Sequence, residues 1–238
     1  MNYCHIKHIA VFRERQNRMK LPFKNRREAG EQLASELASM TSLTNVLVLA
    51  LPRGGVPVAE PIAQRLGVPL SVLLVRKLGV PGQPEVAMGA ISENGVRVLN
   101  NEIVETLAID TREIARIEQR ERQELERRQQ LYRSGTPLPK VTGKTVILVD
   151  DGLATGATMK AAIKVLKRDK AGTIVVAVPV AARETALEIR SDIDRLVCLA
   201  KPYPFAAIGY WYQDFSQVSD DEVLEIIQRH SSKFGSAV

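Results

Sequence analysis

The feature that most constrains the fold is an alternation of short apolar runs with stretches of helical periodicity. The runs are rich in Val, Ile and Leu, which is typical of strands buried on both faces. They span Val46–Leu51, Leu70–Val75, Val146–Val149, Ile174–Val178 and Leu196–Leu199. Helices are predicted over Glu28–Met40 and Val56–Leu66, from Ala157, after Ala181 and after Ser219. This alternation predicts an α/β fold with a parallel sheet, which binds ligands beyond the carboxyl ends of its strands.

Composition narrows the class of protein. Of the 238 residues, 45% are hydrophobic and 25% are charged, which is ordinary for a globular chain and predicts one domain with elaborations. We find no apolar stretch of membrane-spanning length and no signal-peptide pattern, so we expect no membrane partner. The two distant cysteines, Cys4 and Cys198, predict no disulfide framework and a cytoplasmic location. The net charge of +6 suits nucleic acid and a small polyanionic substrate equally.

The stretch "VILVDDGLATGATMKAA", which begins at Val146, predicts a strand, a loop of small residues and a helix. Leu153 is the only long side chain between Gly152 and Thr158. Neither a Walker P-loop nor a G-x-G-x-x-G fingerprint is present. We still expect the loop amides to converge on a phosphate at the positive end of the helix, with hydroxyls from Thr155 and Thr158.

Two adjacent carboxylates, Asp150 and Asp151, precede this loop. They would repel a phosphate unless they face another part of the ligand. Carboxylates accept hydrogen bonds from sugar hydroxyls and stabilise positive charge that develops at an anomeric carbon. The pattern therefore predicts a sugar phosphate that reacts at the end away from its phosphate.

These residues resemble the phosphoribosyl pyrophosphate (PRPP) motif of type I phosphoribosyltransferases. The resemblance implies a parallel-sheet core with helices on both faces, and a catalytic role for Asp150 and Asp151 on the ribose diol. It also implies Mg²⁺, held mainly through PRPP without an all-protein site, and a homodimer. The implied 5′-phosphate-binding residues are Leu153, Ala154, Thr155, Gly156, Ala157 and Thr158.

Two further stretches resemble parts of the same family. "LPRGGVPVA" is similar to the pyrophosphate loop, in which Arg53 would supply charge and Gly54 and Gly55 would let the backbone approach. The Pro52–Arg53 peptide is expected to be cis, as that loop often is in the family. "VRKLGVPGQPE" is similar to the start of the mobile catalytic loop of adenine phosphoribosyltransferases, so Arg76 and Lys77 would contact pyrophosphate. The alternatives are a plain strand-to-helix turn and a solvated Arg-Lys pair.

The sequence also departs from the family. Ala154 stands where 6-oxopurine enzymes carry an acid credited as general base. Another acceptor of the proton is then needed, and Glu85 is a candidate, although a solvated carboxylate is the plainer interpretation.

The segment 77–142 is longer than usual for the family. It holds a hairpin signal, "SENG", between Val86–Ile91 and Val96–Leu99, and a charged helix. That helix is predicted to open at Asp110, in capping-box spacing with Glu113, and to close near Gly135. We interpret it as a solvated arm or dimer strut; a nucleic-acid face is possible on charge but not favoured, because Glu residues interleave the Arg.

The two ends of the chain complete the expected organisation. Residues 1–18 are predicted to be an appendage, in which "CHIKH" has metal-ligand types but no second pair. Residues 200–238 resemble the hood of hypoxanthine-guanine enzymes and end in a helix. There Phe205, Trp211 or Tyr212 could stack on a planar base, although packing is the plainer role for such aromatics.

The resemblance implies a phosphoribosyltransferase that moves the phosphoribosyl group of PRPP to a nucleobase-like acceptor, as in purine salvage. Two alternatives remain open at this stage. One is a non-enzymatic regulator that senses PRPP or nucleotides, and the other is a sugar-phosphate hydrolase on the same fold.

Overall fold

A computed structural model describes residues 21–40, 44–134 and 138–234. Its centre is a five-stranded parallel sheet in the order β2-β1-β6-β7-β8. The central strand, β6, is the apolar run that precedes the paired aspartates, and its five residues are all buried. The α/β fold expected from the alternation is confirmed. The strands of this sheet are β1 Val46–Ala50, β2 Leu70–Val72, β6 Thr145–Val149, β7 Thr173–Val180 and β8 Arg195–Ala200.

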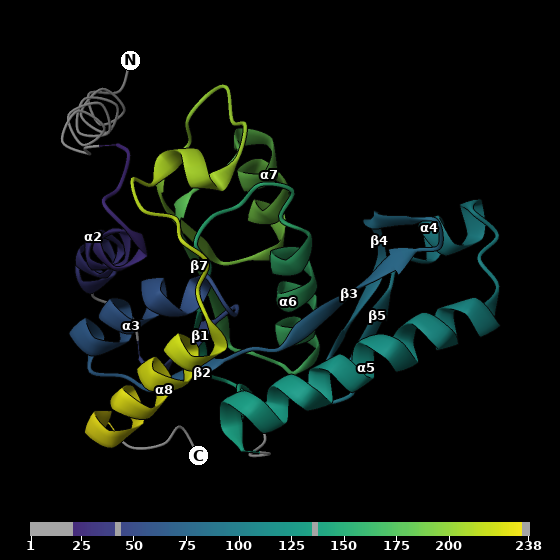
Figure 1. Cartoon of the computed structure of the whole chain (residues 1–238), viewed down its shortest axis with the longest axis horizontal. Coiled ribbons are helices and arrows are strands. Elements are labelled where there is room, and N and C mark those ends of the chain that lie inside the picture. The colour runs from purple at the N-terminus through teal and green to yellow at the C-terminus, as the bar shows by residue number, and fades with distance from the viewer. Residues whose placement is uncertain (1–20, 41–43, 135–137, 235–238) are drawn as a thin grey trace.

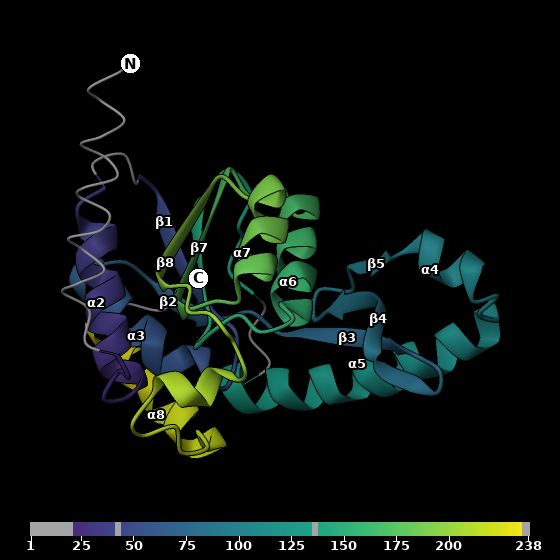
Figure 2. The ribbon, with the colours of Figure 1, turned by 90° about the horizontal axis from the view of Figure 1, so that it is seen from above.

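Helices cover both faces of the sheet (Figures 1 and 2). Alternate strand residues point to opposite faces, so Val48 and Ile147 pack toward one set of helices while Leu47 and Val146 pack toward the other. The first set is α2 Arg26–Ala38, α3 Gly55–Leu66 and α8 Asp220–Phe234. The second set is α6 Ala157–Arg168, α7 Arg183–Glu188 and the short 3₁₀ helix η1 Ile189–Asp192.

The apolar run 70–75, predicted as one strand, is divided between two sheets. After β2 the chain leaves the parallel sheet through the buried residues Leu73 and Leu74. It then enters a three-stranded antiparallel sheet in the order β3-β4-β5. The single-strand prediction was wrong because unbroken hydrophobicity shows burial but not a change of direction. The strands are β3 Val75–Val80, β4 Gln83–Ser92 and β5 Arg97–Leu99.

Residues 79–84, within the stretch that resembles the start of the mobile catalytic loop, form the tip of the β3–β4 hairpin. Pro81 and Gly82 make the turn, and Gly82 has a φ of +74°. The predicted β4–β5 hairpin is confirmed, with Ala90 paired to Val98. A short helix that the sequence did not predict, α4 Asn101–Thr106, follows β5.

The charged helix α5, Thr111–Arg133, lies along the antiparallel sheet (Figure 1). Asp110 caps it, but its Oδ1 accepts from the backbone N–H of Arg112, at 2.7 Å, not from that of Glu113. Ile114, Leu125 and Tyr132 are buried. The solvated-arm interpretation is therefore wrong for one face of the helix, which is packed. The helix ends at Arg133 and its C-cap is Ser134, which agrees with the predicted end near Gly135.

The segment after β8 folds back over the carboxyl end of the sheet. It contains the 3₁₀ helix η2, Ile208–Trp211, and is tied to the start of the chain by Phe23, whose N–H donates to the carbonyl oxygen of Trp211 at 2.8 Å. The predicted appendage 1–18 and its "CHIKH" lie outside the described residues. Among the residues that the structure describes, no helix has both the length and the apolar character needed to cross a membrane.

Candidate functional site

Asp150 and Asp151 stand at the carboxyl end of the central strand, where polar partners fix them. Asp150 Oδ1 accepts from the backbone N–H of Asp151 at 2.9 Å. Asp151 Oδ2 accepts from Nε of Arg26 at 2.8 Å, and both side chains of this ion pair are almost buried. The hydroxyl of Tyr212 donates to the carbonyl oxygen of Asp151 at 2.7 Å. The pair is thus held rigidly, and Arg26 balances one of its two charges.

Burial dominates the electrostatics of the two carboxyls. It raises the pKa of Asp150 well above its usual value, and the neighbouring charge of Asp151 raises it further. Burial also raises the pKa of Asp151, while the hydrogen bond from Arg26 opposes that rise. A ligand that brings hydrogen-bond donors to these oxygens would favour the ionised form. Sugar hydroxyls are donors of this kind.

The "LPRGG" turn between β1 and α3 lies against these aspartates. A Cβ at Gly54 would come within 2.0 Å of Asp151 Oδ2, and one at Gly55 within 2.7 Å of the carbonyl oxygen of Val149. Only glycine permits this approach. The peptide between Pro52 and Arg53 is cis, as expected. Arg53 is partly exposed, and its Nη1 lies 3.9 Å from Asp220 Oδ1.

The loop before α6 leaves its backbone donors open. Gly156 caps α6 with a φ of +68°, and the Thr185 hydroxyl donates to the carbonyl oxygen of Ala154. Within the described chain, the backbone N–H groups of residues 154–158 donate to no main-chain carbonyl. Leu153 differs from the expectation, because its N–H donates to the carbonyl oxygen of Val180 at 2.9 Å and its side chain is buried. The cluster of open donors therefore begins at Ala154.

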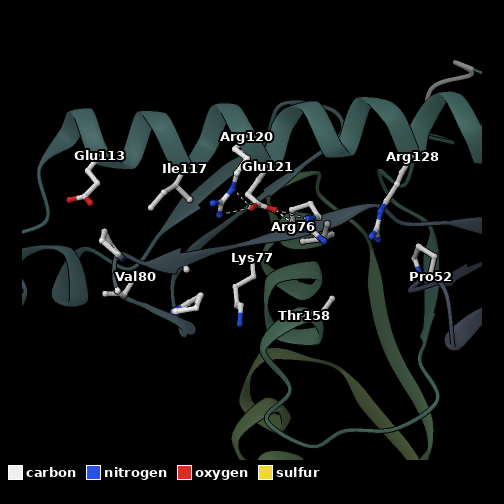
Figure 3. Close-up of a pocket in the computed structure, with 15 residues that line it drawn as sticks. Pro52, Arg76, Lys77, Val80, Glu113, Ile117, Arg120, Glu121, Arg128 and Thr158 are labelled. Atoms are coloured by element: carbon white, nitrogen blue, oxygen red, sulfur yellow. Dashed lines mark hydrogen bonds and ion pairs between the residues drawn. The ribbon is translucent and has the colours of Figure 1, made fainter. Parts of the chain in front are cut away.

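A cavity of about 680 Å³ lies between α5, the β3–β4 hairpin and the start of α6 (Figure 3). Arg76 and Lys77 line it from β3, and Thr158 lines it from α6. Arg120 and Arg128 line it from α5, and no sequence motif pointed to either residue. The remaining lining residues are Pro52, Val75, Gly79, Val80, Pro81, Gly82, Pro84, Glu113, Ile117 and Glu121.

Glu121 joins the two walls of this cavity. Its Oε2 accepts from Arg76 Nε at 2.7 Å, and its Oε1 accepts from Arg120 Nε at 3.1 Å. Because Glu121 is itself buried, it fixes the register between α5 and β3. Four cationic side chains then face two carboxylates, Glu113 and Glu121, around the cavity, so its surface favours an anion.

The other predicted loop residues lie apart from this cavity. Thr155 and Ala157 line a second cavity of about 310 Å³ between α6 and the other side of the β4–β5 hairpin, with Lys160 and Lys164. The two aspartates lie beneath the "LPRGG" turn. The predicted site thus consists of adjoining parts around the start of α6.

The predicted aromatic residues form a packed group over the carboxyl end of the sheet. The rings of Phe205 and Trp211 are stacked with their centroids 6.3 Å apart, and those of Tyr212 and Phe215 are stacked at 5.1 Å. Tyr212 is buried and its hydroxyl is bonded, so packing is its role here. Phe205 and Trp211 stay partly exposed.

Two further hypotheses concern a general base and metal ligands. Glu85 belongs to β4, but its side chain lies outside what the structure describes, so its role stays a prediction. Within the described ranges, no three His, Cys, Asp or Glu residues gather as they would around a metal ion.

Arg26 and Arg128 were missed for different reasons. Nothing in the sequence around Arg26 connects it with Asp151, from which 125 positions separate it. Arg128 had a signal, because residues 114, 117, 121, 125, 128 and 132 are spaced by three or four and so share one helix face. A charged residue on an otherwise packed face indicates a specific partner.

Comparisons with known proteins identify relatives of this chain. The family described as "Phosphoribosyl transferase domain" matches residues 24–214. Two curated Mycobacterium tuberculosis proteins, each named "Putative phosphoribosyl transferase", are 46% identical over 92% of this chain and 49% of their own length. The chain therefore spans about half the length of these relatives. The crystal structure of TT1426 from Thermus thermophilus is 42% identical with a TM-score of 0.81, over 88% of this chain and 99% of that one.

Proposed function

Because the chain belongs to the phosphoribosyl transferase domain family, we propose that it transfers the 5-phosphoribosyl group of PRPP to a nitrogen of a nucleobase-like acceptor and releases pyrophosphate. One observation carries the proposal. The "DDGLATGAT" loop and the "LPRGG" turn meet at the carboxyl end of β6, with Gly54 in contact with Asp151. Groups suited to a phosphate, a diol and a pyrophosphate thus lie next to one another.

The 5′-phosphate would bind at the start of α6. The open N–H groups of residues 154–158 and the hydroxyls of Thr155 and Thr158 supply donors there, and the helix end adds positive potential. This assignment fixes one end of the ribose.

The other end of the ribose would face Asp150 and Asp151. Their carboxylates accept from the 2′- and 3′-hydroxyls, and the negative charge stabilises C1′ as the bond to pyrophosphate breaks. Nucleophilic attack by the acceptor nitrogen then forms the new bond at C1′, and the electron pair of the broken bond leaves with pyrophosphate.

The leaving pyrophosphate would be bound by Arg53, by the backbone of Gly54 and Gly55, and by Arg76 and Lys77. Mg²⁺ prefers oxygen ligands, so the oxygens of PRPP and the carboxylates of Asp150 and Asp151 beside the proposed site fit this ion. When bound, Mg²⁺ would supply positive charge that stabilises the leaving group.

The acceptor is the least constrained part of the proposal. A purine-type base would fit a salvage role, with Phe205 and Trp211 as candidate contacts and Glu85 as the candidate base. We also propose that the protein is a cytoplasmic homodimer. The curated relatives are about twice as long as the part that matches this chain. The activity of a whole protein that contains this domain is therefore part of the proposal.

A panel assay tests the function. The chain is incubated with PRPP, Mg²⁺ and single purine or pyrimidine bases, and pyrophosphate release is followed. Transfer predicts release that depends on one base or a small set of bases and exceeds the base-free rate at least about tenfold.

Other results of the panel identify the alternatives. Equal release with and without bases would indicate a hydrolase. Tight PRPP binding without release under any condition would indicate a sensor. Either outcome would contradict the proposed transfer.

A further inference from the structure

The inserted helix α5 carries one charged residue whose position its packing does not explain. Residues 114, 117, 121, 125, 128 and 132 form the face that lies on the molecule. Ile114, Leu125 and Tyr132 on this face are buried in the main core cluster. Glu121 is buried and bonded to Arg76. Arg128 shares the face with these residues, but 26% of its side chain stays exposed.

Arg128 instead faces the proposed ligand site. It lines the cavity of about 680 Å³ and also a small crevice beside it, and Pro52 and Thr158 line both with it. In Figure 3 its side chain extends from α5 toward the region between these two residues. Pro52 precedes Arg53 of the "LPRGG" turn, and Thr158 belongs to the proposed phosphate loop. Arg128 on the inserted helix α5 therefore lies where the "LPRGG" turn and the proposed phosphate loop meet.

The neighbouring turn of α5 strengthens this placement. Tyr132, one turn after Arg128, donates its hydroxyl to Asp220 Oδ1. The same oxygen lies 3.9 Å from Nη1 of Arg53. Arg53 and Arg128 thus lie on the same side of the molecule, close to one tyrosine.

The ligand-free partner of Arg128 can release it at low cost. Glu124 accepts from Nε of Arg128 at 2.7 Å, and also from Nε and Nη2 of Arg127 at 2.8 and 3.0 Å. Two guanidinium groups therefore share one carboxylate, which leaves a net positive charge. If an anion binds Arg128, Glu124 keeps Arg127, and no carboxylate is left without a cation.

We propose that Arg128 of the inserted helix α5 binds the pyrophosphate group of PRPP, so that the insertion completes the ligand site formed by the two core loops. The inference rests on the proposed function. A guanidinium suits this role because it presents paired donors to phosphate oxygens.

The chain offers a matched control for this proposal. Arg127 and Arg128 are adjacent, carry the same charge and share Glu124, but only Arg128 lines the cavity. We would prepare Arg128→Ala, Arg128→Lys and Arg127→Ala in the full chain. Calorimetric titration would measure the affinities of PRPP with Mg²⁺, pyrophosphate with Mg²⁺, and ribose 5-phosphate.

The expected pattern separates the ligands. Arg128→Ala should weaken PRPP and pyrophosphate about 10- to 100-fold, as loss of a charge-assisted hydrogen bond does. Ribose 5-phosphate, which has no pyrophosphate, should change less than about twofold. The affinity of Arg128→Lys for PRPP and pyrophosphate should lie between those of Arg128→Ala and the parent, because lysine keeps the charge but lacks the paired donors of a guanidinium. Arg127→Ala should leave ribose 5-phosphate unchanged and should weaken PRPP and pyrophosphate much less than Arg128→Ala does, because it removes only the cation that Glu124 would keep.

Several outcomes would overturn the proposal. One is an Arg128→Ala protein that binds PRPP and pyrophosphate like Arg127→Ala, and another is equal weakening of all three ligands. If Arg128→Ala fails to fold, Arg128→Lys serves instead. Parental affinity of that variant for PRPP and pyrophosphate would contradict a contact made by the paired donors of the Arg128 guanidinium. A parent chain that binds none of the three ligands would instead reject the proposed function itself.

Discussion

At the scale of single residues, Asp150 and Asp151 differ in how the folded chain balances their charges. Asp151 has the guanidinium of Arg26 at 2.8 Å, whereas Asp150 has a single backbone N–H at 2.9 Å. Burial raises the pKa of both carboxyls, and that of Asp150 is raised further by the charge of Asp151. Ionisation of Asp150 therefore destabilises the ligand-free folded state. Perturbed carboxyls of this kind are common at ligand-binding sites.

Replacing Asp150 with Asn should raise stability and abolish most turnover. Asn keeps an oxygen that can accept from the N–H of Asp151, but it removes the cost of ionisation. Pyrophosphate release should fall about 10²- to 10³-fold, because the charge opposite C1′ is lost. Thermal unfolding, measured beside turnover, checks both effects.

The gain in stability should depend on pH with a definite sign. The folded pKa of Asp150 is raised, so near pH 4 and below the parent and the variant should differ little. As pH rises from there toward the folded pKa, the carboxyl ionises in the unfolded parent but stays protonated in the folded one, so the parent loses stability relative to the variant. Each pKa unit of elevation corresponds to about 1.4 kcal/mol. A difference that is independent of pH would contradict this account.

Asp151→Asn provides the contrast. The hydrogen bond from Arg26 opposes the rise in the pKa of Asp151, and Asp151→Asn removes that charged acceptor, so it should raise stability less than Asp150→Asn does. The two variants should therefore shift the unfolding free energy by different amounts at neutral pH, with the larger gain at Asp150.

Much of the residue-scale site could be predicted from sequence. Gly54 and Gly55 were expected to let the backbone approach pyrophosphate, which stays a prediction, and the structure shows Gly54 against Asp151. Arg26 could not be predicted, because its partner is remote in the chain and no local pattern records the pair. Leu153 was misjudged for a related reason, since its N–H is taken by Val180 on a neighbouring strand.

At the scale of elements, the helix α5 shows how a highly charged sequence can still carry a packed face. Its apolar residues are few, but they recur at intervals of three and four and fall on one side. Leu125 is 1% exposed on that side. The interpretation as a solvated arm weighed the number of apolar residues more than their spacing. The packed face joins the insertion to the core.

Leu125→Ala should test this attachment. Truncation of a buried leucine costs about 2–5 kcal/mol through lost burial and the cavity that remains. A free arm would lose almost nothing. Chemical denaturation of the full chain measures the change, and Leu107→Ala is the control, because Leu107 is 49% exposed and should change stability by less than about 0.5 kcal/mol.

The apolar run 70–75 shows what a hydrophobicity pattern cannot predict at the scale of elements. The run 70–75 is apolar throughout, yet the chain passes from the parallel sheet into the antiparallel one within it. The turn at Leu73 and Leu74 depends on what each half pairs with, which hydrophobicity does not record. By contrast, the hairpin at "SENG" was predictable because its turn residues are local.

At the scale of the whole molecule, the proposed site lies where the core meets the insertion. The core contributes the "LPRGG" turn and the start of α6, and the insertion contributes Arg76, Lys77 and Arg128. The core half was predictable, because its motifs are contiguous in sequence. The half of the site that the insertion contributes was only partly predictable. Its residues come together because α5 lies along β3 and reaches Pro52 (Figures 1 and 3), and the sequence does not record this packing.

The central claim is that these parts form one PRPP site. The most direct measurement is a crystal structure of the full chain with PRPP and Mg²⁺. The account predicts the 5′-phosphate on the N–H groups of residues 154–158, the ribose hydroxyls on Asp150 and Asp151, and the pyrophosphate between Arg53 and Arg128. PRPP bound away from residues 150–158, or with its pyrophosphate beyond reach of both arginines, would contradict it.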